Sequence, residues 1–92
     1  MTSEGHPGAR LQQALASGNL TAAEQAAFEV AFVPLPEARG LVELYAEKGH
    51  PKYERAAMKY LRRLMDEQDP SLADFVQVAA ILAERGMLIR GL

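Results

Sequence analysis

Apolar side chains recur every three or four residues through most of this chain, which is the spacing of amphipathic α-helices. No segment shows the alternation with a period of two that a half-buried β-strand requires. Glycine and proline residues interrupt the helical pattern at short intervals. The pattern therefore predicts an all-α fold, a compact bundle of about five helices with short loops, with the helices over residues 9–17, 21–33, 36–48, 51–67 and 71–85.

The predicted helix boundaries depend on residues with known capping preferences. The segment TAAE, from Thr21 to Glu24, matches a capping box, in which both side chains bind backbone amides at a helix start. Ser71 and Asp74 match the spacing of a second box. Glycine often follows the last residue of a helix, because it adopts a left-handed backbone without strain. We therefore expect helix ends at Gly18, Gly49 and Gly86.

Two of the predicted helices carry apolar residues on more than one side. In residues 21–33, small residues share one side and Phe28 and Phe32 lie on another, which favours a helix buried on both sides over an exposed patch for a partner. Residues 71–85 carry a stripe broad enough for the middle of a bundle. The stripe consists of Leu72, Phe75, Val76, Ala79, Leu82 and Ala83. The apolar tail 87–92 either returns to the core or packs on a second copy in a dimer.

The composition is that of a folded domain. Of the 92 residues, 49% are hydrophobic and 24% are charged, which is typical of globular rather than disordered chains. A chain of this length has room for one modest core. We expect a single helical domain over residues 9–92, preceded by a disordered tail at residues 1–8 that contains glycine, proline and small polar residues. Because Ala and Leu dominate the sequence, the core should be mostly aliphatic.

The chain contains no cysteine, which excludes a disulfide framework, a thiolate zinc site and a cysteine nucleophile. Its first residues lack the basic and apolar regions of a secretory signal. The longest apolar run, from Phe75 to Ala83, is interrupted by Gln77 and is too short for a membrane span. These observations predict a cytoplasmic protein that does not bind a membrane.

Residues capable of catalysis are few and scattered. The two histidines are His6, in the predicted tail, and His50, which precedes a proline and is expected to serve a turn or a cap. Glu43 and Glu47 have the spacing of paired carboxylates on one helix face, but nearby cations favour surface ion pairs. We therefore expect no enzymatic activity, no metal site, no cofactor and no small-molecule substrate.

The most distinctive feature is a cluster of cations in the predicted helix 51–67. Residues 50–65 contain five cations and one anion, which gives a local charge of +4 in a chain of net charge −2. At 100° per residue, the cations fall on one side of the helix and apolar residues fall on the opposite side. The candidate partner-binding residues are Lys52, Arg55, Lys59, Arg62 and Arg63.

Three interpretations of these cations stay open. A polar helix face must carry charge, so the cations could serve solvation alone. The arginines could instead bind carboxylates of an acidic protein, or the face could follow a phosphate backbone. Nucleic acid is the second choice, because the isoelectric point is about 5.6 and residues 51–67 contain no Asn or Gln to read bases.

Parts of the chain resemble known proteins. In residues 41–60, small and aromatic positions resemble those that interlock the two helices of a tetratricopeptide repeat. These positions are Leu41, Tyr45, Gly49, Tyr53, Ala56 and Tyr60. The segments ASGNLTAAE, VPLPEARGLVELYAEKG and PKYERAAMKYLRRL resemble a class of short, uncharacterised, Ala/Leu-rich helical proteins from actinobacterial genomes. That resemblance implies an all-α fold and carries over no functional residue.

Together these features predict a small, non-enzymatic protein–protein interaction module. Its basic helix face over residues 52–63 would bind an acidic partner, and the protein could also associate with itself as a homodimer. The alternative is a small nucleic-acid-associated regulator that uses the same cations.

Overall fold

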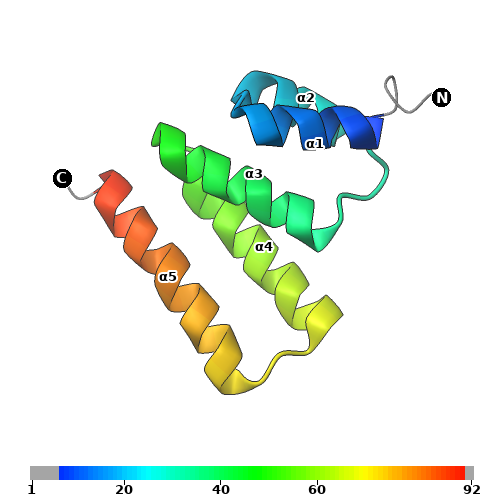
Figure 1. Ribbon diagram of the computed structural model, residues 1–92. Coiled ribbons are helices and arrows are strands. Elements are labelled where there is room, and N and C mark those ends of the chain that lie inside the picture. The colour runs from blue at the N-terminus through cyan, green and yellow to red at the C-terminus, as the bar shows by residue number, and fades with distance from the viewer. Residues whose placement is uncertain (1–6, 91–92) are drawn as a thin grey trace. The chain divides into compact units, whose positions relative to one another are not determined.

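The computed structural model describes the backbone of residues 7–90 and the side chains of residues 8–89. Over this range the chain forms five helices joined by short loops, without a strand (Figure 1). The helices are α1 (Pro7–Ser17), α2 (Leu20–Glu29), α3 (Leu35–Lys48), α4 (Tyr53–Gln68) and α5 (Leu72–Arg90). The prediction of an all-α fold of about five helices is confirmed.

The chain divides into two compact units, Met1–Leu44 and Tyr45–Leu92, whose boundary lies within α3. The single domain predicted over residues 9–92 stays a prediction. Most of the predicted tail, residues 1–6, lies outside the described residues. Helix α1 begins at Pro7, two residues earlier than expected, since the fixed φ of proline suits a first helical turn.

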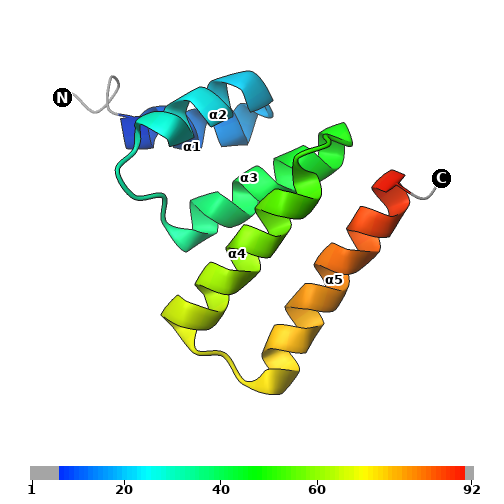
Figure 2. The same ribbon diagram turned by 180° about the vertical axis from the view of Figure 1, so that it is seen from behind.

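In the first unit, α1 and α2 lie side by side as an antiparallel hairpin (Figures 1 and 2). Gly18, with φ of +74°, makes the expected left-handed turn between them. Gly40 of α3 lies close to α1, because a Cβ at this position would be 3.2 Å from Leu15 Cδ1. Small and aliphatic side chains fill the core, which allows the helices to approach closely. These residues are Leu11, Ala14, Ala23, Ala26 and Leu44.

The start of α2 differs from the sequence prediction. The N-cap is Asn19, whose side-chain oxygen accepts the Ala22 amide at 3.0 Å. The helix therefore begins at Leu20, and Thr21, the expected cap, already lies inside it. Asparagine satisfies an orphan amide at least as well as threonine does, so the earlier of two possible caps starts the helix.

The end of α2 also differs from the prediction, because the helix stops at Glu29 instead of Phe32 or Val33. Val30 has an extended backbone, with φ of −82° and ψ of 131°, and its amide is shared between the carbonyls of Ala26 and Ala27. A branched Cβ disfavours the helical backbone at this position. The chain then stays non-helical through Pro34, and Pro36 lies in the first turn of α3.

The connection between α3 and α4 follows the sequence prediction more closely. Gly49, with φ of +59°, ends α3 as expected. His50 has a structural role in the turn: its Nδ1 accepts the Lys52 amide at 3.1 Å, and its ring is tilted against Tyr45 with the ring centroids 5.1 Å apart. The turn includes Lys52, so α4 begins at Tyr53, two residues later than predicted.

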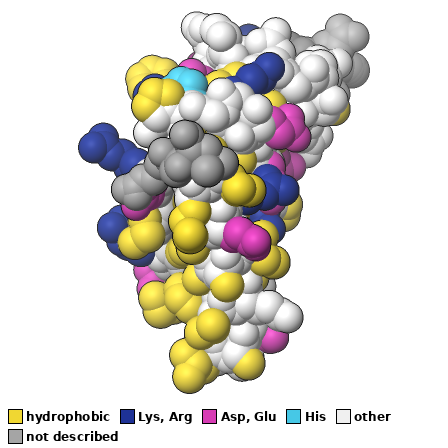
Figure 3. Space-filling view, turned by 90° about the vertical axis from the view of Figure 1, so that its left-hand side faces the viewer, with side chains coloured by type: hydrophobic (Ala, Val, Ile, Leu, Met, Phe, Trp, Pro, Cys, Tyr) yellow, Lys and Arg dark blue, Asp and Glu magenta, His cyan; other side chains and the backbone are white. Residues whose placement is uncertain are grey.

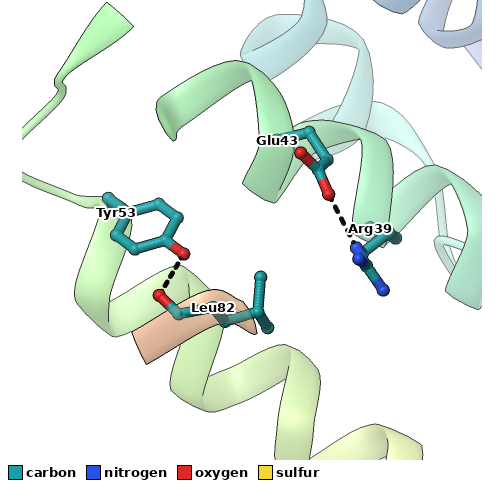
Figure 4. A network of polar contacts seen from close by, with 4 residues as sticks. All are labelled: Arg39, Glu43, Tyr53 and Leu82. Atoms are coloured by element: carbon teal, nitrogen blue, oxygen red, sulfur yellow. Dashed lines mark hydrogen bonds and ion pairs between the residues drawn. The ribbon is translucent and has the colours of Figure 1, made fainter. Parts of the chain in front are cut away.

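In the second unit, large aromatic residues are buried. They are Tyr45, Tyr53 and Tyr60. The Tyr53 hydroxyl donates a 2.7 Å hydrogen bond to the backbone oxygen of Leu82 in α5 (Figure 4). A Cβ on Gly86 would lie 3.5 Å from Tyr53 Cε2, an ordinary contact distance, so the ring packs beside Gly86. Helix α5 continues to Arg90, so Gly86 is an interior residue and the predicted C-cap at Gly86 is wrong.

The two phenylalanines of the second predicted helix are exposed, not buried. Phe28 is 91% exposed and Phe32 is 62% exposed. The buried residues of α2 are Ala23 and Ala26, which face the other way. The expectation of a helix buried on both sides is therefore wrong for α2, which packs against the core through its alanines and Leu20.

Helix α5 does not lie in the middle of a bundle, as its broad apolar stripe had suggested. Leu82 is buried, but Leu72 is 79% exposed. The predicted return of the tail to the core is also wrong for its described part, because Met87 and Leu88 continue α5 and are exposed. Residues 91 and 92 lie outside the described range.

Candidate partner-binding face on α4

Helix α4 separates apolar and charged residues onto opposite sides, since residues three, four and seven apart share a helix face. Tyr53, Ala57 and Tyr60 are buried on one side. The other side carries the cations predicted from the sequence, of which Lys52, Arg55, Lys59 and Arg62 are exposed and Arg63 is half-buried. The structure therefore brings four of the five predicted residues to one side of α4, and Lys52 precedes the helix as its N-cap.

The central part of this side is a row of three cations, Arg55, Lys59 and Arg62, which we call the α4 basic ridge. Their spacing of i, i+4 and i+7 aligns them along the helix over about 10 Å. All three side chains are exposed. Among the side chains of residues 8–89, none forms a hydrogen bond or ion pair with any of the three. The ridge is thus available to an external anion.

The other two predicted cations are placed differently. Arg63 donates from Nε to Glu67 Oε2 at 2.8 Å and from Nη2 to Oε1 at 3.4 Å. This carboxylate already neutralises the guanidinium, so Arg63 offers little free charge. Lys52 occupies the N-cap, before the first turn. Asp66 is exposed one turn after Arg62 and places an anion at the C-terminal end of the ridge.

Two methionines form an apolar row beside the ridge. Met58 and Met65 are 48% and 51% exposed. They are seven residues apart, and at 100° per residue they lie about 40–80° around the helix from Arg55 and Arg62. Methionine adapts its shape to varied apolar surfaces. The charge pattern alone does not identify the two methionines as part of the candidate site. The repeat of methionine at i and i+7 beside the cations is a sequence feature that could have indicated them.

One of the two paired carboxylates of α3 forms an ion pair within the helix. Arg39 Nε donates to Glu43 Oε2 at 2.9 Å within α3, which confirms the ion-pair interpretation for Glu43 (Figure 4). Glu47 is exposed. In the part of the chain that the structure describes, no group of three or more His, Asp and Glu side chains is placed to hold a metal ion. The absence of enzymatic activity and of a cofactor stays a prediction.

Helices α1 and α2 border a shallow groove lined mainly by alanines and polar side chains. Arg10 and Glu29, two of the lining residues, form an ion pair with each other. Ser17 is the hydroxyl residue among the lining side chains, and it donates to the Ala14 carbonyl at 3.2 Å. Because this serine is hydrogen-bonded to the backbone and has no neighbouring base in the groove, the groove lacks the arrangement of an activated nucleophile.

No family model matches this chain, and no curated protein or solved structure matches it either. The resemblances to a tetratricopeptide hairpin and to short actinobacterial helical proteins therefore stay predictions. Within residues 7–90, every helix is too short or too polar to cross a membrane. The cytoplasmic location stays a prediction as well.

Proposed function

We propose that this protein is a non-enzymatic interaction module whose helix α4 binds an acidic, amphipathic helix of a partner protein. The observation that carries the proposal is the α4 basic ridge, three exposed cations without a partner among the described side chains. Exposed arginines bind carboxylates through bidentate hydrogen bonds, and lysine adds a point charge. The ridge therefore favours an anionic ligand.

The methionine row favours an anionic ligand that also carries apolar side chains. Met58 and Met65 expose apolar surface along the same length of α4 as the ridge. A helix that carries acidic residues in one row and leucine-like residues in the neighbouring row would match both rows at once. Such contacts combine an apolar anchor with a charged border, which is the usual composition of a protein interface.

The same features make nucleic acid the second candidate. A phosphate backbone would use the cations but not the methionines, and α4 carries an anion, Asp66, at one end of the ridge. The chain as a whole is acidic, with an isoelectric point of about 5.6, which opposes a long polyanion. An acidic helix of limited length avoids this repulsion because it contacts α4 alone.

A designed peptide tests the proposal without knowledge of the natural partner. The probe is a labelled helical peptide with Glu at positions i, i+4 and i+7 and Leu at i+3 and i+10, the spacing of the two rows on α4. We expect saturable binding in fluorescence anisotropy. Each exposed ion pair contributes about 0.2–1 kcal/mol, so Arg55→Glu, Lys59→Glu and Arg62→Glu together should weaken binding roughly 10–100-fold.

Two controls separate this mode from general charge attraction. The variants Arg62→Glu and Lys48→Glu make the same charge change at exposed positions, but only the first lies on the ridge. A peptide with Ser in place of Leu should bind more weakly than the probe. Equal effects of Arg62→Glu and Lys48→Glu, or no binding of the probe at low salt, would reject the proposal.

Labelled duplex DNA and RNA address the alternative in the same assay. If the ridge follows a phosphate backbone, affinity should fall with a log–log salt slope of about −3, because each neutralised phosphate contributes about −0.9. Tighter binding of nucleic acid than of the probe, lost in the triple variant, would replace the acidic helix by nucleic acid as the ligand.

A further inference from the structure

Helix α5 leaves one apolar side uncovered. Its buried side centres on Leu82, and the uncovered side carries hydrophobic side chains along the helix (Figure 3). Arg90, the last residue of α5, has the same angular position as Leu72. Before it, six uncharged residues fall within about 100° of one another on that side, at 100° per residue. They are Leu72, Val76, Ala79, Ala80, Ala83 and Met87, which we call the α5 stripe. Five of the six side chains are exposed, and Ala79 is half-buried.

The α5 stripe is symmetric about its centre. Val76 and Ala83 lie equally far on either side of the midpoint between Ala79 and Ala80, and so do Leu72 and Met87. If two α5 helices pack antiparallel about this midpoint, the larger Val76 therefore meets the smaller Ala83 of the second copy, and the reverse. Two-fold packing requires this kind of self-complementary surface. Alanines at the centre permit a close approach of the two helices.

Polar residues at the border of the α5 stripe agree with the same register. Gln77 and Glu84 are exposed and lie on the same edge of the stripe. In the antiparallel arrangement, Gln77 is level with Leu82 of the other copy, and Glu84 of that copy lies two residues, about 3 Å, from this level along the axis. An amide N–H of Gln77 can therefore reach this carboxylate at two symmetric places. Glu84 also lies near the N-terminal half of the other helix, where the helix dipole favours a negative charge.

We propose that α5 pairs with α5 of a second copy as an antiparallel, two-fold symmetric dimer. The contact is limited in size, because Leu72 and Met87 are about 22 Å apart along the helix axis and a helix is about 10 Å wide. This strip supplies less than the roughly 800 Å² per partner of a standard interface. The dimer is therefore expected to be weak and reversible. It leaves the α4 basic ridge free, so it does not depend on the proposed function.

Sedimentation velocity over a wide range of protein concentration tests the dimer. The wild-type chain should change from the mass of one copy to the mass of two. Ala83→Glu places a charge in the centre of the stripe and should weaken dimerisation at least tenfold. The matched control is Ile81→Glu, which adds the same charge to α5 about 160° away around the helix and should dimerise like the wild type. Circular dichroism of both variants checks that the helices form.

Cysteine cross-linking tests the register, because the natural chain contains no cysteine. When Val76→Cys protein and Ala83→Cys protein are mixed and oxidised, disulfides between the two variants should outnumber those within each variant. A parallel pair would instead favour Val76→Cys linked to itself. A wild-type chain that stays at the mass of one copy throughout, or equal dimerisation of the Ala83→Glu and Ile81→Glu variants, overturns the proposal.

Discussion

The two units of this protein fill their cores with different kinds of side chain. The first unit, Met1–Leu44, is packed with alanine and leucine, and its fully buried large residue is Leu11. The second unit, Tyr45–Leu92, buries three tyrosines, and Tyr53 reaches a backbone carbonyl of another helix. The first core depends on close approach of helices, whereas the second depends on rings that span the space between helices.

This difference teaches how a chain with few large apolar residues can build two cores. Alanine buries little area for each residue, so α1 and α2 must lie close together, and leucines such as Leu11 and Leu44 supply much of the apolar contact. A tyrosine ring buries far more area, but its hydroxyl needs a hydrogen-bond partner when it is buried. In the first unit, we therefore expect the largest loss of stability when Leu11 is substituted. In the second unit, the loss should be divided between the ring and the hydroxyl group of the buried tyrosines.

The largest effect is expected for Leu11→Ala. Leu11 is 1% exposed within the cluster of α1, α2 and α3 residues, so its removal leaves a cavity. Such substitutions lower the free energy of unfolding by about 2–5 kcal/mol, and the helices here cannot approach further to close the gap. Urea denaturation followed by circular dichroism measures the loss. The control Leu72→Ala, at an exposed position, should change stability by less than about 0.5 kcal/mol. Similar losses for both would contradict the comparison.

A smaller effect is expected for Tyr53→Phe. The change keeps the ring against Gly86 and removes the 2.7 Å hydrogen bond to the Leu82 oxygen. That carbonyl lies inside α5 and keeps its helical hydrogen bond, so the loss should be about 1 kcal/mol, near the average for one bond. The same denaturation experiment measures it. Tyr53→Leu, which also removes the ring, should cost clearly more. An unchanged stability of the Tyr53→Phe variant would mean that the second core depends on the rings alone.

The sequence predicted the helices better than it predicted their ends. Existence and order of the helices follow from the apolar spacing, and the end of α3 at Gly49 follows from a local glycine signal. Gly86 gives the same local signal but lies inside α5, which continues to Arg90. A glycine is compatible with a helix interior as well as with a helix end, so this residue type alone does not fix the boundary. The start of α2 at Asn19 was missed for another reason, since two plausible caps stood close together.

The candidate site was predictable in part. The row of Arg55, Lys59 and Arg62 could be read from helical spacing alone, since it depends on one element. The pairing of Arg63 with Glu67 was also readable, because the two are four residues apart on one helix. The exposure of the methionines and of the α5 stripe could not be predicted from the sequence, because it depends on which other helices cover α4 and α5. An apolar pattern on a helix indicates a face that can be buried. It does not predict whether another helix of the chain covers that face.

The smallest effect is expected for Phe28→Ser. Phe28 is 91% exposed, and serine and phenylalanine have similar helix propensities, so the free energy of unfolding should change by less than about 0.5 kcal/mol. A phenylalanine buried as the sequence predicted would instead cost about 3–5 kcal/mol on truncation. The matched control on the same helix is Ala26→Ser, at a buried position, where an unpaired hydroxyl costs about 1–3 kcal/mol. If Phe28→Ser proved more costly than Ala26→Ser, an aromatic residue would contribute to the first core after all, and the contrast between an alanine core and a tyrosine core would fail.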